Sequence, residues 1–214
     1  MLEMKKNSLS VGIINLAVSN IFSVYEGCKK AGYKVEVISK KTNKFHHDIV
    51  IVPGVGSFKS GMRFFYENNL DKKIKDYLLK PNALVYGICL GMQLLFEKSY
   101  EFQENRGLSL VSGDVRKFNN KKTYVTHLGW NNILLKKNEH KKYFKKFENK
   151  NFYFVHSYFV NPSNKKEIFG TSKHGNKNFC SIIKKKNIFG TQFHPEKSGL
   201  MGIEFLKSLK YLKN

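Results

Sequence analysis

The sequence predicts an α/β fold with a central, mostly parallel sheet flanked by helices and with additional β strands in the second half of the chain. Two observations support this class. In the first half, short apolar runs alternate with segments of helical periodicity, which is typical of βαβ units. In the second half, strand signals predominate. The uninterrupted apolar runs indicate strands that are buried on both faces.

The first half is expected to contain four buried strands and three helical regions. The strands are expected at 10–16, 34–39, 48–52 and 83–88. The helices are expected at 20–31, 60–79 and 90–99. Asn20 is a candidate N-cap for the first helix and Gly32 follows its end, while Pro53 and Gly54 end the third strand.

The second half is expected to add strands and a final helix. The strands are expected near 113–118, 123–127, 131–135, 152–159, 167–173, 179–184 and 188–193. An amphipathic helix at 199–212 would pack Leu200, Ile203, Leu206 and Leu209 on one side. No composition break separates the two halves, so we expect a single domain over residues 1–214.

Composition excludes several classes of protein. With 41% hydrophobic and 14% aromatic residues, the 214-residue chain is not a disordered protein. No apolar run reaches the roughly 18 residues of a membrane helix, and no convincing signal peptide is present. The three cysteines, Cys28, Cys89 and Cys180, are odd in number and widely spaced, which favours neither a disulfide framework nor a zinc site. We therefore expect a cytoplasmic protein without a metal or cofactor.

The net charge of +22 needs a separate interpretation. Only Arg63, Arg106 and Arg116 are arginines, and arginine is the better reader of bases and phosphates. The lysines are scattered, with their densest stretch at 136–146. We interpret this as a solvated lysine-rich surface and expect no nucleic-acid partner. A basic face that attracts an anionic substrate or an acidic partner remains the alternative.

The segment Gly87–Gly91 (GICLG) places Cys89 where a buried strand ends and a helix begins. This is the cysteine version of the G-x-S-x-G nucleophile elbow. The helix N-terminus favours a thiolate there, and the backbone N–H of the next residue is placed to stabilise an oxyanion. The alternative is a buried cysteine beside packing glycines.

Residues 192–196 (QFHPE) supply a candidate base and its orienting acid. A thiol nucleophile needs a base, and the base needs an acceptor that orients it, so His194 and Glu196 complete a set with Cys89. Alone, this segment also fits a loop histidine beside a surface glutamate.

The turn at 53–56 (PGVG) suits the second half of an oxyanion hole, or an ordinary strand end.

These elements, in this order, resemble the class I (triad) glutamine amidotransferases. Two further stretches, 127–131 (HLGWN) and 153–158 (YFVHSY), are similar to signatures of the HisH family, the glutaminase subunits of imidazole glycerol phosphate synthase. The segments 194–199 (HPEKSG) and 87–99 (GICLGMQLLFEKS) also resemble the HisH form. The resemblance covers essentially the whole chain.

The resemblance implies a mechanism and a set of site residues. Cys89 would attack the side-chain amide of L-glutamine, His194 would transfer the protons, and Glu196 would orient His194. Backbone N–H groups would hold the oxyanion, and further residues would contact the substrate. This second group comprises Gly54, Val55, Gly56, Leu90, Gln93, Ser157 and Tyr158.

The resemblance also implies a partner. Ammonia would pass to a HisF-type (β/α)₈ cyclase subunit in a heterodimer, which would make imidazole glycerol phosphate and AICAR in histidine biosynthesis. Trp130, Tyr153 and Lys197 match family positions at that interface. The alternatives are core aromatics for Trp130 and Tyr153, and a solvated lysine for Lys197.

One segment departs from the family pattern. Residues 15–20 (NLAVSN) lack the acidic residue, the aromatic residue and the glycines that are usual after the first strand, and Leu128 replaces a methionine. This keeps open a HisH-like paralogue that supplies ammonia for amination of a cell-surface sugar. A non-enzymatic basic binding module is a third reading, but it gives no reason for the Cys–His–Glu set.

Overall fold

The structure is a computed structural model that describes residues 8–16, 20–39, 42, 44–118 and 125–213. Its main sheet begins with five neighbouring strands in the order β2-β1-β3-β4-β14, and every pair among them is parallel. Their bounds are Ser10–Ile14 (β1), Lys34–Ile38 (β2), Ile49–Val52 (β3), Leu84–Ile88 (β4) and Ile188–Thr191 (β14). The predicted parallel sheet is confirmed.

The sheet continues with five further strands in the order β13-β11-β7-β5-β6, whose pairs are antiparallel except for the β5–β7 pair. Their bounds are Lys177–Lys185 (β13), Tyr158–Pro162 (β11), Val111–Lys117 (β7), Phe96–Ser99 (β5) and Asn105–Arg106 (β6). Strand β12 (Ile168–His174) pairs with β13 and with the short β9 (Leu134–Leu135). Strands β8 (His127–Asn132) and β10 (Asn151–His156) form a separate two-stranded sheet.

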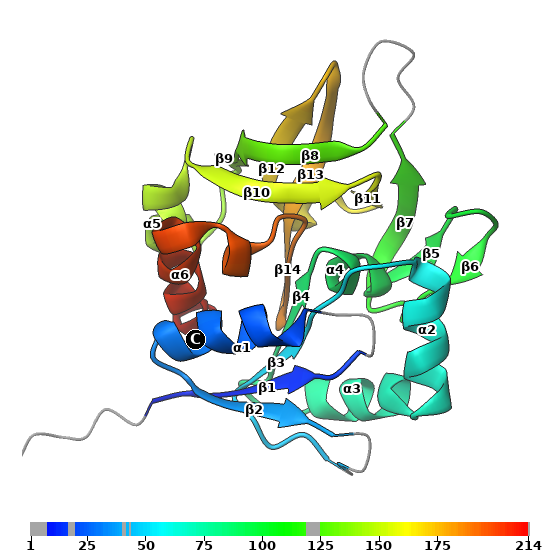
Figure 1. Ribbon diagram of the computed structural model, residues 1–214, viewed down its shortest axis with the longest axis vertical. Helices are drawn as coiled ribbons and strands as arrows, with labels where there is room; N and C mark the ends of the chain where they lie inside the picture. The colour runs from blue at the N-terminus through cyan, green and yellow to red at the C-terminus, as the bar shows by residue number, and fades with distance from the viewer. Residues whose placement is uncertain (1–7, 17–19, 40–41, 43, 119–124, 214) are drawn as a thin grey trace, which may run out of the picture.

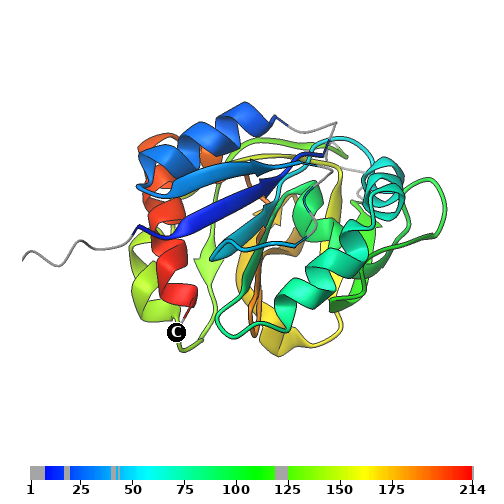
Figure 2. The same ribbon diagram turned by 90° about the horizontal axis from the view of Figure 1, so that it is seen from below.

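Helices cover both faces of the parallel part of the sheet (Figures 1 and 2). On one face lie α1 (Ile21–Lys30) and α6 (Gly199–Lys207), and on the other lie α2 (Phe58–Glu67) and α3 (Leu70–Leu78). The side chains of β3 alternate between two cores, with Ile49 and Ile51 in one and Val50 and Val52 in the other. The short helices are α4 (Leu90–Leu94), α5 (Lys141–Phe144) and four 3₁₀ turns at Lys145–Phe147, Lys165–Glu167, Pro195–Lys197 and Ser208–Leu212.

Local signals explain the helix starts. The Asn20 side chain accepts a hydrogen bond from the backbone N–H of Ser23 at 3.3 Å, so the predicted N-cap is confirmed. Ser57 caps α2 in the same way through the N–H of Ser60.

The two-stranded sheet lies above the carboxyl ends of β4 and β14, where α4 begins (Figure 1).

Several predicted elements were wrong. The helix expected at 90–99 ends at Leu94, because Phe96–Ser99 pairs with β7 and β6 and buries Phe96 and Ser99. The strand expected at 152–159 is broken at Ser157 into β10 and β11, and the strand expected at 131–135 is β8 and β9. Leu200 is 83% exposed rather than packed on the final helix.

Some predicted features fall outside the described residues. Positions 17–19 of the divergent 15–20 segment and positions 123–124 of the strand expected at 123–127 are among them, and of the rest of that expected strand only His127 lies in a strand, as the first residue of β8. Across the described part of the chain, no helix is long and apolar enough to cross a membrane. The same part contains no cluster of three or more His, Cys, Asp or Glu side chains arranged for a metal ion. All three cysteines are free and buried.

Candidate active site

Cys89 stands at a strained elbow between β4 and α4. Its φ and ψ are 52° and −109°, a conformation that a non-glycine residue adopts only when the surroundings impose it. The neighbouring glycines allow the tight turn. A Cβ on Gly91 would lie 1.8 Å from the Val52 carbonyl oxygen, and one on Gly87 would lie 2.6 Å from the Met92 nitrogen. The backbone therefore lifts the Cys89 side chain out of the end of the sheet.

His194 and Glu196 lie just after β14, the strand beside β4. The His194 Nδ1 to Glu196 Oε1 distance is 2.7 Å, and the two side chains are only 2% and 3% exposed. The other ring nitrogen, Nε2, is buried and has no hydrogen-bond partner among the described residues. The adjacent parallel strands thus bring Cys89 and His194 to the same edge of the sheet.

The surroundings of His194 favour its protonated form. Burial lowers the pKa of His194, but the negative charges of the Cys89 thiolate and then of Glu196 more than offset this, and the pKa rises to about 10. An imidazolium that is stable at neutral pH is suited to protonate a group that leaves the carbon to which the Cys89 sulfur has bonded. Cys89, His194 and Glu196 are therefore candidates for a nucleophile, an acid–base group and an orienting side chain.

A pocket of about 270 Å³ opens beside Cys89. Its lining includes most of the predicted substrate-binding residues, namely Val55, Gly56, Leu90, Gln93, Ser157 and Tyr158. Gly54 lies behind this lining, since a Cβ there would stand 3.0 Å from the Leu90 Cβ. The structure thus brings the predicted oxyanion turn, the elbow and residues 157–158 around one hollow.

Backbone N–H groups are available for a developing negative charge. Leu90 is the first residue of α4, and the first N–H groups of a helix have no acceptor within the helix. The 53–56 turn reaches the same pocket, and Gly56 has φ +99°, which glycine adopts without strain. Both segments line the same pocket, and their role as the two halves of an oxyanion hole stays a prediction.

Four further residues belong to the site and were missed in the sequence. Glu101, Val155 and His156 line the pocket. The buried Gln192 donates from Nε2 to Cys89 Sγ at 3.5 Å. Gln192 stands in the QFHPE segment and His156 in the YFVHSY segment, so these two motifs already contained them.

Gln93 connects these groups. Its Nε2 donates to the Tyr158 carbonyl oxygen at 3.0 Å and to Gln192 Oε1 at 3.2 Å. The amide nitrogen of Gln93 is therefore held by the protein while the side chain lines the pocket. Substrate contact by Gln93 stays a prediction.

The three predicted interface residues lie near the loop after β14 that carries His194 and Glu196. Trp130 is 58% exposed, so its alternative as a core aromatic was wrong. Its ring meets that of its cross-strand neighbour Tyr153 at 6.0 Å. The backbone of Tyr153 accepts from His194 N at 2.9 Å and donates to Ser198 Oγ at 3.0 Å. Lys197 is exposed and follows Glu196 directly.

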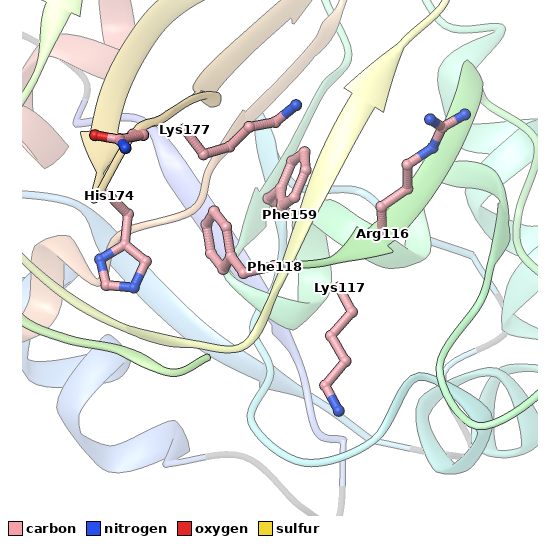
Figure 3. Close-up of a pocket in the computed structure, with 7 residues that line it drawn as sticks. Arg116, Lys117, Phe118, Phe159, His174 and Lys177 are labelled. Carbon is pink, nitrogen blue, oxygen red and sulfur yellow. The ribbon is translucent and has the colours of Figure 1, made fainter. Parts of the chain in front are cut away.

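A second hollow, of about 340 Å³, lies at the end of β7 (Figure 3). Phe118, Phe159 and His174 gather at its centre, while Arg116 and Lys117 lie at its edge. None of the predicted catalytic or substrate-binding residues lines it. The Arg116 guanidinium is already paired with Asp114, at 2.8 and 2.9 Å.

Comparisons with known proteins show which family the chain belongs to. Residues 13–208 match the family "Glutamine amidotransferase class-I". The "Imidazole glycerol phosphate synthase subunit HisH" of Carboxydothermus hydrogenoformans is 36% identical, over 92% of this chain and 97% of that protein. The subunit of the same name from Bacillus thuringiensis is 41% identical, over 94% and 93%.

A solved structure shows the same fold. The structure of PurLQS from Thermotoga maritima matches with a TM-score of 0.73 and 17% identity, over 96% of this chain and 100% of that one. This similarity supports the fold, and the more similar sequences identify the branch. The chain belongs to the class-I glutamine amidotransferases and, within them, to the HisH family, the glutaminase subunits of imidazole glycerol phosphate synthase in histidine biosynthesis.

Proposed function

We propose that this glutamine amidotransferase hydrolyses L-glutamine through a thioester on Cys89, with His194 and Glu196 completing the catalytic set. The observation that carries the proposal is the buried His194–Glu196 pair, 2.7 Å apart, whose histidine pKa is raised by the charge of the elbow cysteine. Acyl transfer through a covalent intermediate uses a nucleophile, a base and an acid that orients the base, and these three side chains lie together at the carboxyl ends of neighbouring strands.

The steps follow from the geometry. The Cys89 thiolate attacks the side-chain amide carbon, and the N–H groups of Leu90 and the 53–56 turn hold the oxyanion. The C–N bond then breaks, and the His194 imidazolium gives its proton to the departing ammonia. Neutral His194 next takes a proton from water, which attacks the thioester, so that glutamate leaves and the His194 proton and Cys89 thiolate are restored.

The thioester gives a direct test of the proposal. The chain is mixed with radiolabelled L-glutamine, quenched in acid and digested. Label is expected on the peptide that contains Cys89 and is expected to leave on treatment with hydroxylamine. Cys89→Ala is the blank. Steady glutamate formation by an enzyme that never carries label on Cys89 would contradict the covalent route.

Glu101 is proposed to bind the α-ammonium group of glutamine. It is the one carboxylate among the described residues that line the pocket. Its Oε2 also accepts the backbone N–H of Phe58, at the start of α2, which fixes the side chain in place. An amino-acid substrate brings a cation, and a fixed carboxylate suits it.

Glu101→Gln is therefore expected to raise the KM for glutamine tenfold to a hundredfold with little change in kcat. The glutamine side chain keeps an acceptor for Phe58 but loses the charge, and a hydrogen bond to a charged group is worth about 1.5–3 kcal/mol. Steady-state glutamate release measures both constants. Glu104→Gln, at an exposed residue paired with Lys98, is the control. An unchanged KM would exclude the assignment.

We further propose that the partner is a HisF-type (β/α)₈ cyclase, bound over the face of β8 and β10 that carries the exposed Leu128 and Trp130 side chains. The relatives described above are named as subunits of a synthase. On this face Leu128 is 65% exposed beside the exposed Trp130, and their cross-strand neighbours Val155 and Tyr153 are half-buried. A contiguous apolar patch beside a catalytic loop is typical of a subunit interface.

Trp130→Ala is expected to weaken association with the cyclase by about 2 kcal/mol or more, which is about a 30-fold rise in Kd. Titration of the cyclase with the variant, followed by calorimetry, measures the change. Phe22→Ala removes another exposed aromatic side chain, 75% exposed on α1, and serves as the control. Equal Kd values for Trp130→Ala and the wild type would place the interface elsewhere.

The histidine pathway is favoured over the surface-sugar alternative by the names of the relatives.

We also propose one domain over residues 1–214, because a single core cluster includes both Val11 of β1 and Leu212 near the end of the chain. A cytoplasmic location is proposed as well, and the three unpaired cysteines support it.

A further inference from the structure

A chain of side-chain hydrogen bonds runs from β8 to the glutamine pocket. Asn131 Nδ2 lies 3.0 Å from His127 Nε2, and His127 Nδ1 lies 3.1 Å from His156 Nε2. His156 Nδ1 lies 2.7 Å from the carbonyl oxygen of Tyr158. His127 and His156 are directly paired residues of β8 and β10, and both are buried. We call Asn131, His127 and His156 the imidazole relay.

The Tyr158 carbonyl oxygen, at the end of the imidazole relay, determines which ring nitrogen of each histidine carries the proton. A carbonyl oxygen only accepts, so His156 Nδ1 must carry the proton that it donates to Tyr158. In neutral His156 the Nε2 atom then accepts, and His127 Nδ1 must be the donor. In neutral His127 the Nε2 atom accepts in turn, and it faces a donor in Asn131 Nδ2. The three side chains thus have one consistent arrangement.

The orientation of the Asn131 amide is fixed independently. Its Nδ2 also donates to the Lys173 carbonyl oxygen at 2.8 Å, and its Oδ1 accepts from the backbone N–H of Asn132 at 2.8 Å. Turning the amide over would break both bonds. Asn131 therefore presents a donor to His127, and an amide donor at this position excludes a proton on His127 Nε2.

The surroundings keep both imidazoles neutral, as the relay requires. Burial, with a further contribution from nearby His174, lowers the pKa of His127 to about 4. Burial also lowers the pKa of His156, to about 3. The His174 ring stacks on His127 at 4.5 Å, and Phe118 packs against both His174 and His156. Figure 3 shows Phe118 and His174 side by side.

The imidazole relay ends at a corner that forms part of the pocket wall. Ser157 and Tyr158 join β10 of the small sheet to β11 of the main sheet, and we call them the 157–158 corner. The Tyr158 carbonyl oxygen accepts both the His156 Nδ1–H and the Gln93 Nε2–H. Gln93 in turn reaches Gln192, which donates to Cys89 Sγ. The corner is thus held from two sides, by the relay and by the elbow helix.

We propose that the imidazole relay positions the 157–158 corner for glutamine binding, so that His127, His156 and Asn131 are positioning residues for the substrate. This proposal rests on the proposed glutaminase function. The corner forms part of the pocket lining beside Cys89, and the relay ties it to the strand that carries Trp130. None of the three side chains takes part in bond making or bond breaking.

Two matched variants of His156 separate the bond to the corner from packing. In His156→Asn the amide nitrogen stands near the position of Nδ1 and donates to Tyr158, whereas the contact with His127 is lost. In His156→Gln the side chain reaches the position of Nε2 but leaves Tyr158 without its donor. Both remove the ring, so their packing losses are similar.

The relay predicts a difference between these two variants. His156→Gln is expected to raise the KM for glutamine about tenfold, which corresponds to the loss of one buried hydrogen bond, with kcat changed far less. His156→Asn is expected to raise the KM by a smaller factor, because the corner keeps its donor to Tyr158 but loses the support of His127 and Asn131. Equal KM values for the two variants, at equal thermal stability, would overturn the proposal. His140→Gln, at a buried histidine outside the relay, controls for general destabilisation.

Two further measurements keep this test separate from the function itself. Glutamine binding to the same variants in a Cys89→Ala background, measured by calorimetry, requires no hydrolysis. If the wild type does not hydrolyse glutamine, the proposed function fails, while binding still reports on the relay. Nitrogen NMR of the imidazoles is expected to show the proton on Nδ1 of both His127 and His156. A proton on Nε2 of either ring would exclude the arrangement.

Discussion

Replacing Cys89 by alanine is expected to lower glutamine hydrolysis by a factor of about 10⁴ or more. The reason is that the whole covalent route passes through this sulfur, and removal of a catalytic nucleophile leaves only binding and oxyanion stabilisation. Glutamate release at saturating glutamine measures the loss. The variant should keep the fold, because alanine removes a single sulfur atom from the elbow and leaves Gly87 and Gly91 in place.

Cys180 provides the matched control. It is also free and buried, but it lies on β13, outside the pocket lining, and burial raises the pKa of its thiol to about 12. Cys180→Ala is expected to keep wild-type hydrolysis. Mild alkylation should modify Cys89 selectively, with protection by glutamine. A Cys89→Ala variant that still hydrolyses glutamine at the wild-type rate would refute the assignment of the nucleophile.

Replacing Glu196 by glutamine is expected to lower kcat about 10⁴-fold, by analogy with other triads in which the orienting carboxylate is lost. The carboxylate holds the proton of His194 on Nδ1 and stabilises the imidazolium, through a contact of 2.7 Å. An uncharged amide at this position offers either a donor or an acceptor, and it removes a negative charge beside His194.

The pH dependence of this variant gives a second measurement. In the wild type, the Cys89 thiolate and Glu196 raise the pKa of His194 to about 10. Loss of the negative charge of Glu196 must lower that pKa, so the alkaline limb of the kcat/KM profile should move to lower pH. A profile that keeps its alkaline limb while kcat falls would show that Glu196 acts through packing alone.

The sequence was sufficient for the parallel sheet, and its motifs supplied the residues of the proposed catalytic set. Uninterrupted apolar runs such as IVIV in β3 indicate a strand buried on both faces, and GICLG indicates the elbow, whose Gly91 allows close approach to the Val52 carbonyl oxygen of β3. Pairing of Cys89 with His194 depends on β4 lying beside β14, which is a long-range fact. The sequence motifs suggested this pairing through the chemistry that a thiol nucleophile needs and through the resemblance to a family, but they did not reveal the strand order.

The missed residues share one physical cause. Glu101 was overlooked because helical periodicity was extended through 90–99, whereas strand pairing ends the helix at Leu94 and turns the chain so that Glu101 returns to the pocket. Tertiary pairing overrode local propensity there. The roles of His156 and Gln192 depend on hydrogen bonds between distant strands, which no local pattern encodes.

The most direct test of the central claim is glutamate release by this chain mixed with the HisF-type cyclase of the same organism. It is run with and without the nucleotide ligand of the cyclase, and Cys89→Ala serves as the blank. We predict slow hydrolysis by the chain alone and strong, ligand-dependent stimulation in the complex, abolished in the blank. No stimulation by a cyclase that is active with free ammonia would contradict the account.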